Sequence, residues 1–210
     1  VLPSHILSRT FSFLRSNDLI YRPAIKSYML GETPPAFDLL YWNGDATGLP
    51  GKMTVQYLRW LCQQDQFAQS GITLFGEVLR LSDVTVPFCA VACETDHIAA
   101  WPDSYRGFSK MGSRSKTFIL SQSGHIGGII NPPSKKKYGH YTNTDMRLSH
   151  NEWQDNAAFH EGSWWSRWES WLRKKSGKLV PAQQPGSEVF KPLCAAPGTY
   201  VLKGKSTSEK

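Results

Sequence analysis

The sequence lacks long apolar runs and any extended tract of a single charge. No uninterrupted apolar segment in the 210 residues approaches the ~18–20 residues that a membrane-spanning helix requires, so no transmembrane segment is predicted. The net charge of +7 is divided among short clusters, and basic and aromatic residues are not interleaved as on a nucleic-acid-binding platform. The sequence therefore predicts neither a membrane-spanning protein nor a nucleic-acid-binding module.

Paired cysteines and a nucleophile motif are also missing. The four cysteines form no C-x-x-C pair and have no metal-finger spacing, which predicts reduced thiols in a cytosolic protein and no metal site. No G-x-S-x-G or G-x-C-x-G motif occurs, so the sharp turn that presents the nucleophile of an α/β-hydrolase is absent. Either the chain is not an enzyme of this type, or its nucleophile lies upstream of Val1.

The composition is that of a globular protein with an unusual gathering of tryptophans. Apolar residues make up 40% of the chain and charged residues 20%, which is ordinary for a folded domain. Ser163 is predicted to cap a helix that ends near Gly177. At helical spacing, one face of this helix carries Trp164, Trp168, Trp171 and Leu172. Packing of this tryptophan face in the core is the favoured interpretation.

The first part of the chain is predicted to be mostly helical. Residues 54–67 carry apolar side chains at helical spacing, and residues 72–79 indicate a short strand or hairpin. Toward the other end, residues 132–162 are polar and are predicted to be rich in loops, and residues 178–210 are predicted to form an extended tail.

The middle of the chain has the pattern of a strand, a helix and a second strand. Residues 84–93 form a nearly continuous β-rich apolar run, as in a strand that is covered on both faces. Residues 102–111 are predicted to be a helix that begins at a proline, and residues 117–120 a second strand. Because the links are short, the two strands should be parallel.

Asp96 follows the first of these strands and His125 follows the second. The carboxyl ends of parallel strands open onto the same crevice, and the 29-residue separation leaves room for one helix between the strands. An Asp in this place can fix the tautomer of an imidazole and leave its other nitrogen free as a base. A turn aspartate and a solvated histidine remain the alternative. His97 is adjacent to Asp96, but neighbouring side chains on an extended segment diverge.

Three segments resemble the polyhydroxyalkanoate synthases. They are TFSFLRSNDL at residues 10–19, FDLLYWNGDATGLPG at residues 37–51 and SGHIGGIINPP at residues 123–133. The shorter segments TDHI at residues 95–98 and HEGSWW at residues 160–165 fit the same family, of the single-subunit class I type. The similarity extends from about residue 8 to residue 201. This region resembles the C-terminal part of the family's catalytic domain.

The resemblance implies an α/β fold, specifically the C-terminal part of an α/β-hydrolase fold with a mainly helical cap subdomain. Residues 1–80 would be the cap, residues 81–177 the core that carries the acid and the histidine, and residues 178–210 the tail. Arg15 and the loop at residues 43–51 would line the entrance to the site, although a purely structural turn explains the loop equally well.

The resemblance also implies an acyltransferase that polymerises 3-hydroxyacyl-coenzyme A. An upstream Cys would carry the growing polyester as a thioester, with His125 as the catalytic base and Asp96 as its acid partner. Whether Asp96 orients His125 or activates the incoming 3-hydroxyl stays open. No cofactor is implied, because coenzyme A is part of the substrate and a product. Without the Cys, this chain alone should be inactive.

Two other functions also fit these residues. The same pair could serve an esterase or polyester depolymerase, or the chain could be a non-catalytic granule-association module with the tryptophan face as its sticky surface. The family resemblance further implies a homodimeric full-length enzyme in the cytoplasm, associated with polyester granules, without nucleic acid as a partner.

Overall fold

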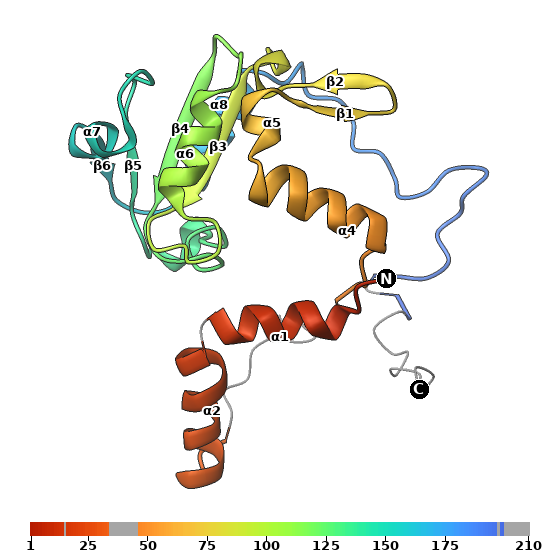
Figure 1. Ribbon diagram of the computed structural model, residues 1–210. Coiled ribbons are helices and arrows are strands. Elements are labelled where there is room, and N and C mark those ends of the chain that lie inside the picture. The colour runs from red at the N-terminus through yellow and green to blue at the C-terminus, as the bar shows by residue number, and fades with distance from the viewer. Residues whose placement is uncertain (15, 34–45, 197, 200–210) are drawn as a thin grey trace. The chain divides into compact units, whose positions relative to one another are not determined.

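The computed structural model describes residues 1–14, 16–33, 46–196 and 198–199 (Figure 1). The chain divides into two compact units, Val1–Trp165 and Ser166–Lys210. The predicted entrance residue Arg15 lies outside the described residues, as do residues 37–45 of the motif at 37–51.

A four-stranded sheet forms the centre of the first unit. Its strands, in their order across the sheet, are β3 (Phe88–Cys93), β4 (Lys116–Ser121), β5 (His140–Thr142) and β6 (Ala158–His160). β3 and β4 are parallel, in register from Phe88 opposite Lys116 to Cys93 opposite Ser121. β5 and β6 are added antiparallel. The mixed sheet and its helices confirm the α/β class, and the predicted parallel pair is present.

Helix α6 (Trp101–Ser109) connects the two parallel strands and lies against β3 (Figure 1). It begins with Pro102 in its first turn, where a proline costs no hydrogen bond. Tyr105 and Phe108 face the sheet and are each 2% exposed. Tyr105 meets the ring of Phe118 edge-on, with 5.0 Å between the ring centroids. The helix thereby holds the carboxyl ends of β3 and β4 next to each other.

Residues 132–162 are rich in loops, as predicted, but they also contain β5, helix α7 (His150–Asp155) and β6, which the sequence did not predict. β5 and β6 are the last strands of the sheet, so the sheet does not end with β4. Ser149 caps α7 and Glu152 bonds back to Ser149, which stabilises a helix of only six residues. Trp153 of α7 is fully buried and completes the aromatic core around Phe118, at 5.3 Å between ring centroids.

Exposure differs among the residues of the tryptophan face, within which Trp171 is partly buried. Trp164 is buried, at 8% exposure, but it precedes helix α8 (Trp165–Arg173). Within α8, Trp168 is 41% exposed and Leu172 is 39% exposed. An amphipathic pattern shows that one face is apolar but not which surface covers it, so the core position of this face stays a prediction.

Residues 1–83 contain helical segments and a hairpin. The helices are α1 (Ser4–Leu14), α2 (Arg22–Ala24) between π-helical segments Asn17–Tyr21 and Ile25–Met29, α4 (Gly51–Tyr57), the π-helical segment Leu58–Gln63, and α5 (Gln66–Gln69). The hairpin pairs β1 (Ile72–Leu74) with β2 (Glu77–Leu79), and a 3₁₀ turn follows at Leu81–Asp83. A second 3₁₀ turn lies at Pro133–Lys135. None of the described helices in this region contains a buried side chain, so the core lies in the later part of the unit.

Candidate active site

The ends of β3 and β4 are tied together by their backbones. The N–H of Glu94 donates to the carbonyl of Ser121 at 2.8 Å, and the N–H of Thr95 donates to the carbonyl of Ser123 at 3.1 Å. These bonds extend the parallel ladder by two residues beyond the strands. The segments that carry Asp96 and His125 therefore leave the sheet side by side, as the sequence predicts.

The structure brings Asp96 and His125 into direct contact. Nδ1 of His125 lies 2.8 Å from Oδ2 of Asp96. The other carboxylate oxygen, Oδ1, accepts hydrogen bonds from the backbone N–H groups of Ile98 and Ala99 at 2.8 and 2.9 Å. These two bonds fix the carboxylate plane, so that Oδ2 is aimed at the imidazole.

The side chain of Asp96 is buried, whereas that of His125 is partly exposed to solvent. The side chain of Asp96 is 8% exposed and that of His125 is 43% exposed. Burial raises the pKa of the Asp96 carboxyl. The hydrogen bonds from Ala99, from His125 and from Ile98 together outweigh it, so the pKa lies below its ordinary value. Asp96 is thus held as a carboxylate that can accept a hydrogen bond from Nδ1–H of His125, while the imidazole remains accessible.

His97 does not share this arrangement. It is exposed, and Asp96 Oδ2 is occupied by His125 rather than by its neighbour in sequence. The geometry agrees with the prediction that adjacent side chains diverge. Arg15, the predicted entrance residue, cannot be placed relative to the pair because it lies outside the described residues.

The two thiols of β3 are unsuited to act as nucleophiles. Burial raises the pKa of Cys89, and burial together with the charge of Asp96 raises the pKa of Cys93 to about 11. A thiol with such a pKa stays protonated near neutrality and is a poor nucleophile. The pair at the strand ends has an acid and a base, but neither the partly buried Cys89 nor the buried Cys93 is suited to serve as its nucleophile.

The described part of the chain contains neither a candidate metal site nor a candidate membrane span. No group of three or more His, Cys, Asp or Glu side chains there could hold a metal ion. Among the same residues, no helix is both long and apolar enough to cross a bilayer.

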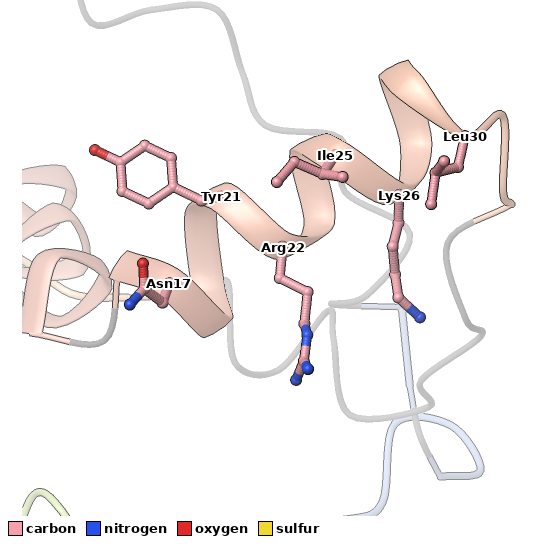
Figure 2. A pocket seen from close by; sticks show the side chains of 6 residues that line it. All are labelled: Asn17, Tyr21, Arg22, Ile25, Lys26 and Leu30. Atoms are coloured by element: carbon pink, nitrogen blue, oxygen red, sulfur yellow. The ribbon is translucent and has the colours of Figure 1, made fainter.

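A surface hollow lies elsewhere, on the helical stretch of residues 17–30 (Figure 2). It is lined by Asn17, Tyr21, Arg22, Ile25, Lys26 and Leu30. Arg22 and Lys26 extend from successive turns to the same side of the helix, and Lys26 pairs with Glu32 at 3.4 Å. All six lining residues belong to one helical stretch, and neither Asp96 nor His125 is among them. The hollow is therefore a furrow between side chains, not the site of the pair.

Sequence reasoning missed the residues that hold the loop of His125. Trp164 donates its indole N–H to the carbonyl of Gly128 at 2.9 Å, and the hydroxyl of Ser121 donates to the same oxygen at 2.9 Å. The prediction placed Trp164 on the face of a helix, which hid this contact. The signal that could have revealed it is the Gly127–Gly128 pair, since adjacent glycines indicate a close approach of backbone.

No protein-family model matches the chain. Among curated proteins, it is 39% identical over 198 residues to the poly(3-hydroxyalkanoate) polymerase subunit PhaC of Cupriavidus necator, which is 93% of this chain and 33% of that protein. It is 37% identical over 203 residues to the poly(3-hydroxyalkanoate) polymerase 2 of Ectopseudomonas oleovorans, 96% of this chain and 36% of that protein. The polymerase of Methylorubrum extorquens is 39% identical over 196 residues, 93% of this chain and 32% of that protein. The chain thus spans about a third of the length of these relatives and matches their C-terminal part.

Proposed function

Since the chain belongs to the poly(3-hydroxyalkanoate) polymerase family, over the C-terminal third of these proteins that it spans, we propose that it supplies the acid and the base of an acyltransferase. The substrate is a 3-hydroxyacyl-coenzyme A, and the product is a polyester with release of coenzyme A. The observation that carries this proposal is the 2.8 Å contact between His125 Nδ1 and Asp96 Oδ2 at the ends of two parallel strands.

Asp96 and His125 have different roles in the proposed reaction. Asp96 accepts a hydrogen bond from Nδ1–H of His125, which keeps the proton on Nδ1 and leaves Nε2 unprotonated as a general base. Nε2 takes the proton of a cysteine thiol, and the thiolate attacks the thioester carbonyl of the substrate. The bond to coenzyme A breaks, and the imidazolium returns its proton to the leaving sulfur. A 3-hydroxyl group then attacks the carbonyl of the enzyme thioester, an ester bond forms as the C–S bond breaks, and the hydroxyl proton passes through the imidazole to the cysteine sulfur, which regenerates the thiol.

The nucleophile of this scheme belongs to the part of the full-length protein outside this chain. The raised pKa of Cys93 argues against a nucleophile within β3. We place β3 to β6 in the C-terminal part of an α/β-hydrolase sheet, with residues 1–80 as a mainly helical cap and Arg15 at the entrance. The full-length enzyme acts as a homodimer in the cytoplasm, at the surface of polyester granules.

The test is turnover of 3-hydroxybutyryl-coenzyme A by the full-length protein, followed by release of coenzyme A. His125→Ala should lose about 10³- to 10⁴-fold in turnover, because removing one member disables a triad that works as a unit. His97→Ala is the matched control, a neighbouring exposed histidine that should remain close to wild type. An active His125→Ala enzyme beside an inactive His97→Ala enzyme would refute the assignment.

A further inference from the structure

The segment that carries His125 is a tight turn, not an extension of β4. The backbone N–H of Gly128 donates to the carbonyl of Gly124 at 3.0 Å, and the N–H of Ile130 donates to that of Ile126 at 2.8 Å. His125 lies within the turn that the first of these two hydrogen bonds closes. Ser123, which precedes the turn, has a φ of +75°, a conformation that costs energy for a residue with a side chain. The turn therefore needs contacts from outside to stay in this shape.

Gly128 is where those contacts meet. A Cβ atom at Gly128 would lie 2.6 Å from Sγ of Cys93 and 2.7 Å from the carbonyl oxygen of Gln122, so the turn is pressed against the end of β3. Its carbonyl accepts from Ser121 Oγ at 2.9 Å and from Trp164 Nε1 at 2.9 Å. A carbonyl oxygen has two lone pairs, and here both are used.

The second donor comes from a distant part of the chain. Trp164 lies 36 residues after Gly128, and it is 8% exposed. The next residue, Trp165, donates its own indole N–H to the carbonyl of Ile129 at 2.9 Å, but it is 36% exposed. Two consecutive indoles thus hold two consecutive carbonyls of the turn. The Trp164 bond is the buried one, where an unmade hydrogen bond costs most.

Resting on the proposed function of His125 as the base, we infer that Trp164 is a positioning residue for that base. Its indole N–H fixes the Gly128 carbonyl and so closes the turn around His125, while Cys93 and Ser121 bound the other sides. The 2.8 Å contact between His125 Nδ1 and Asp96 Oδ2 depends on this closure, because a carboxylate held by the backbone of Ile98 and Ala99 cannot follow a displaced imidazole.

The structure supplies a matched control for removal of the indole N–H. Trp153 is fully buried, and its Nε1 has no hydrogen-bond partner among the described residues. Trp164→Phe and Trp153→Phe therefore remove the same atoms from buried sites, but only the first removes a hydrogen bond. Trp165→Phe removes a more exposed bond of the same kind and should have a smaller effect.

The experiment uses the full-length enzyme with 3-hydroxybutyryl-coenzyme A as the substrate. Trp164→Phe should lower kcat about 10- to 100-fold with KM nearly unchanged, since a misplaced catalytic group slows the reaction step and not binding. Trp153→Phe should keep the wild-type kcat. The proton resonance of His125 Nδ1–H, assigned by its loss in His125→Ala, should persist in Trp153→Phe and disappear in Trp164→Phe.

Equal kcat values for the two phenylalanine variants would overturn the inference, as would a loss of kcat in Trp164→Phe with an unchanged Nδ1–H resonance. Should Trp164→Phe fail to fold, Ser121→Ala removes the other donor to Gly128, and a wild-type kcat and resonance in that variant would also overturn it. The proposed function fails separately, by a wild-type kcat in His125→Ala. The resonance alone would then decide whether Trp164 positions the imidazole.

Discussion

The two carboxylate oxygens of Asp96 have different hydrogen-bond partners. These partners determine how the amide group of an asparagine at this position would be oriented. Oδ1 accepts two backbone N–H groups and must remain an oxygen, so the amide nitrogen of Asp96→Asn is forced to the position of Oδ2. There it donates to His125 Nδ1 and places the imidazole proton on Nε2, the wrong tautomer for a base.

We therefore expect Asp96→Asn to lower turnover of the full-length enzyme about 10⁴-fold without unfolding it. The matched control is Asp103→Asn, at an exposed aspartate that pairs with Arg106 on α6 and should leave turnover unchanged. Coenzyme A release measures both variants. Comparable losses in the two would mean that the effect does not come from the imidazole tautomer.

The lowered pKa of Asp96 has a consequence for stability in acid. Because the pKa is lower in the folded than in the unfolded state, this carboxylate stabilises the fold above the ordinary aspartate pKa. That contribution is lost as the pH falls through the folded-state pKa. Asp96→Asn should flatten the pH dependence of the free energy of unfolding below about pH 4, measured by urea unfolding. An unchanged acid slope would show that the shift is absent.

At the scale of elements, the parallel pair was predictable and the antiparallel additions were not. Residues 84–93 and 117–120 are apolar runs of strand length, and the proline of α6 marks the helix between them. β5 and β6 have three residues each, too few for an alternating pattern to stand out from loop sequence. The contact of His125 with Asp96 follows from the parallel pair, so it could be predicted from the sequence.

The glycine pair Gly127–Gly128 signals a close approach at the His125 turn, but it does not identify the donor, because Trp164 lies 36 residues after Gly128. Trp164 occupies a position that fits the helical repeat of α8, and only the structure shows that the helix begins after it. The cap of α7 did carry a sequence signal, in Ser149 followed by Glu152 three residues later. The capping signal alone is a weak predictor of a helix when the helix that follows it is only six residues long.

The cap of α7 is a test of how the buried Trp153 is held. Ser149→Ala removes the oxygen that accepts from the N–H of Glu152, so we expect the chain to lose about 1 kcal/mol of stability. Ser170→Ala, in the exposed interior of α8, removes a hydroxyl that bonds only within its own helix and should cost nothing. Urea midpoints measure both, and equal midpoints would argue against the cap.

At the scale of the whole chain, buried side chains are unevenly distributed. Among the residues that the structure describes, the buried apolar ones lie between Ala92 and Trp164, and α1 and α4 contain none. Such helices open at little cost. In the 210-residue chain, amide hydrogens of β4 should exchange slowly and those of α1 rapidly, as read by mass spectrometry. Strong protection of α1 would show that it has a cover the described residues do not provide.

The 210-residue chain alone should release no coenzyme A from 3-hydroxybutyryl-coenzyme A. A base without a nucleophile has nothing to activate, and the thiols nearest to the pair stay protonated, with a pKa of about 11 for Cys93. Cys93→Ser should change nothing in this assay. Turnover by the chain that disappears in Cys93→Ser would instead make this thiol the nucleophile.

The most direct test of the account is the first turnover of the full-length enzyme, since the base acts when the thiol is activated. Rapid mixing with 3-hydroxybutyryl-coenzyme A should release one equivalent of coenzyme A from the wild type in a fast phase. If His125 is the base, His125→Ala should slow this phase about 10³-fold or more, and His97→Ala should not slow it. A wild-type first phase in His125→Ala would contradict the assignment of His125 as the base.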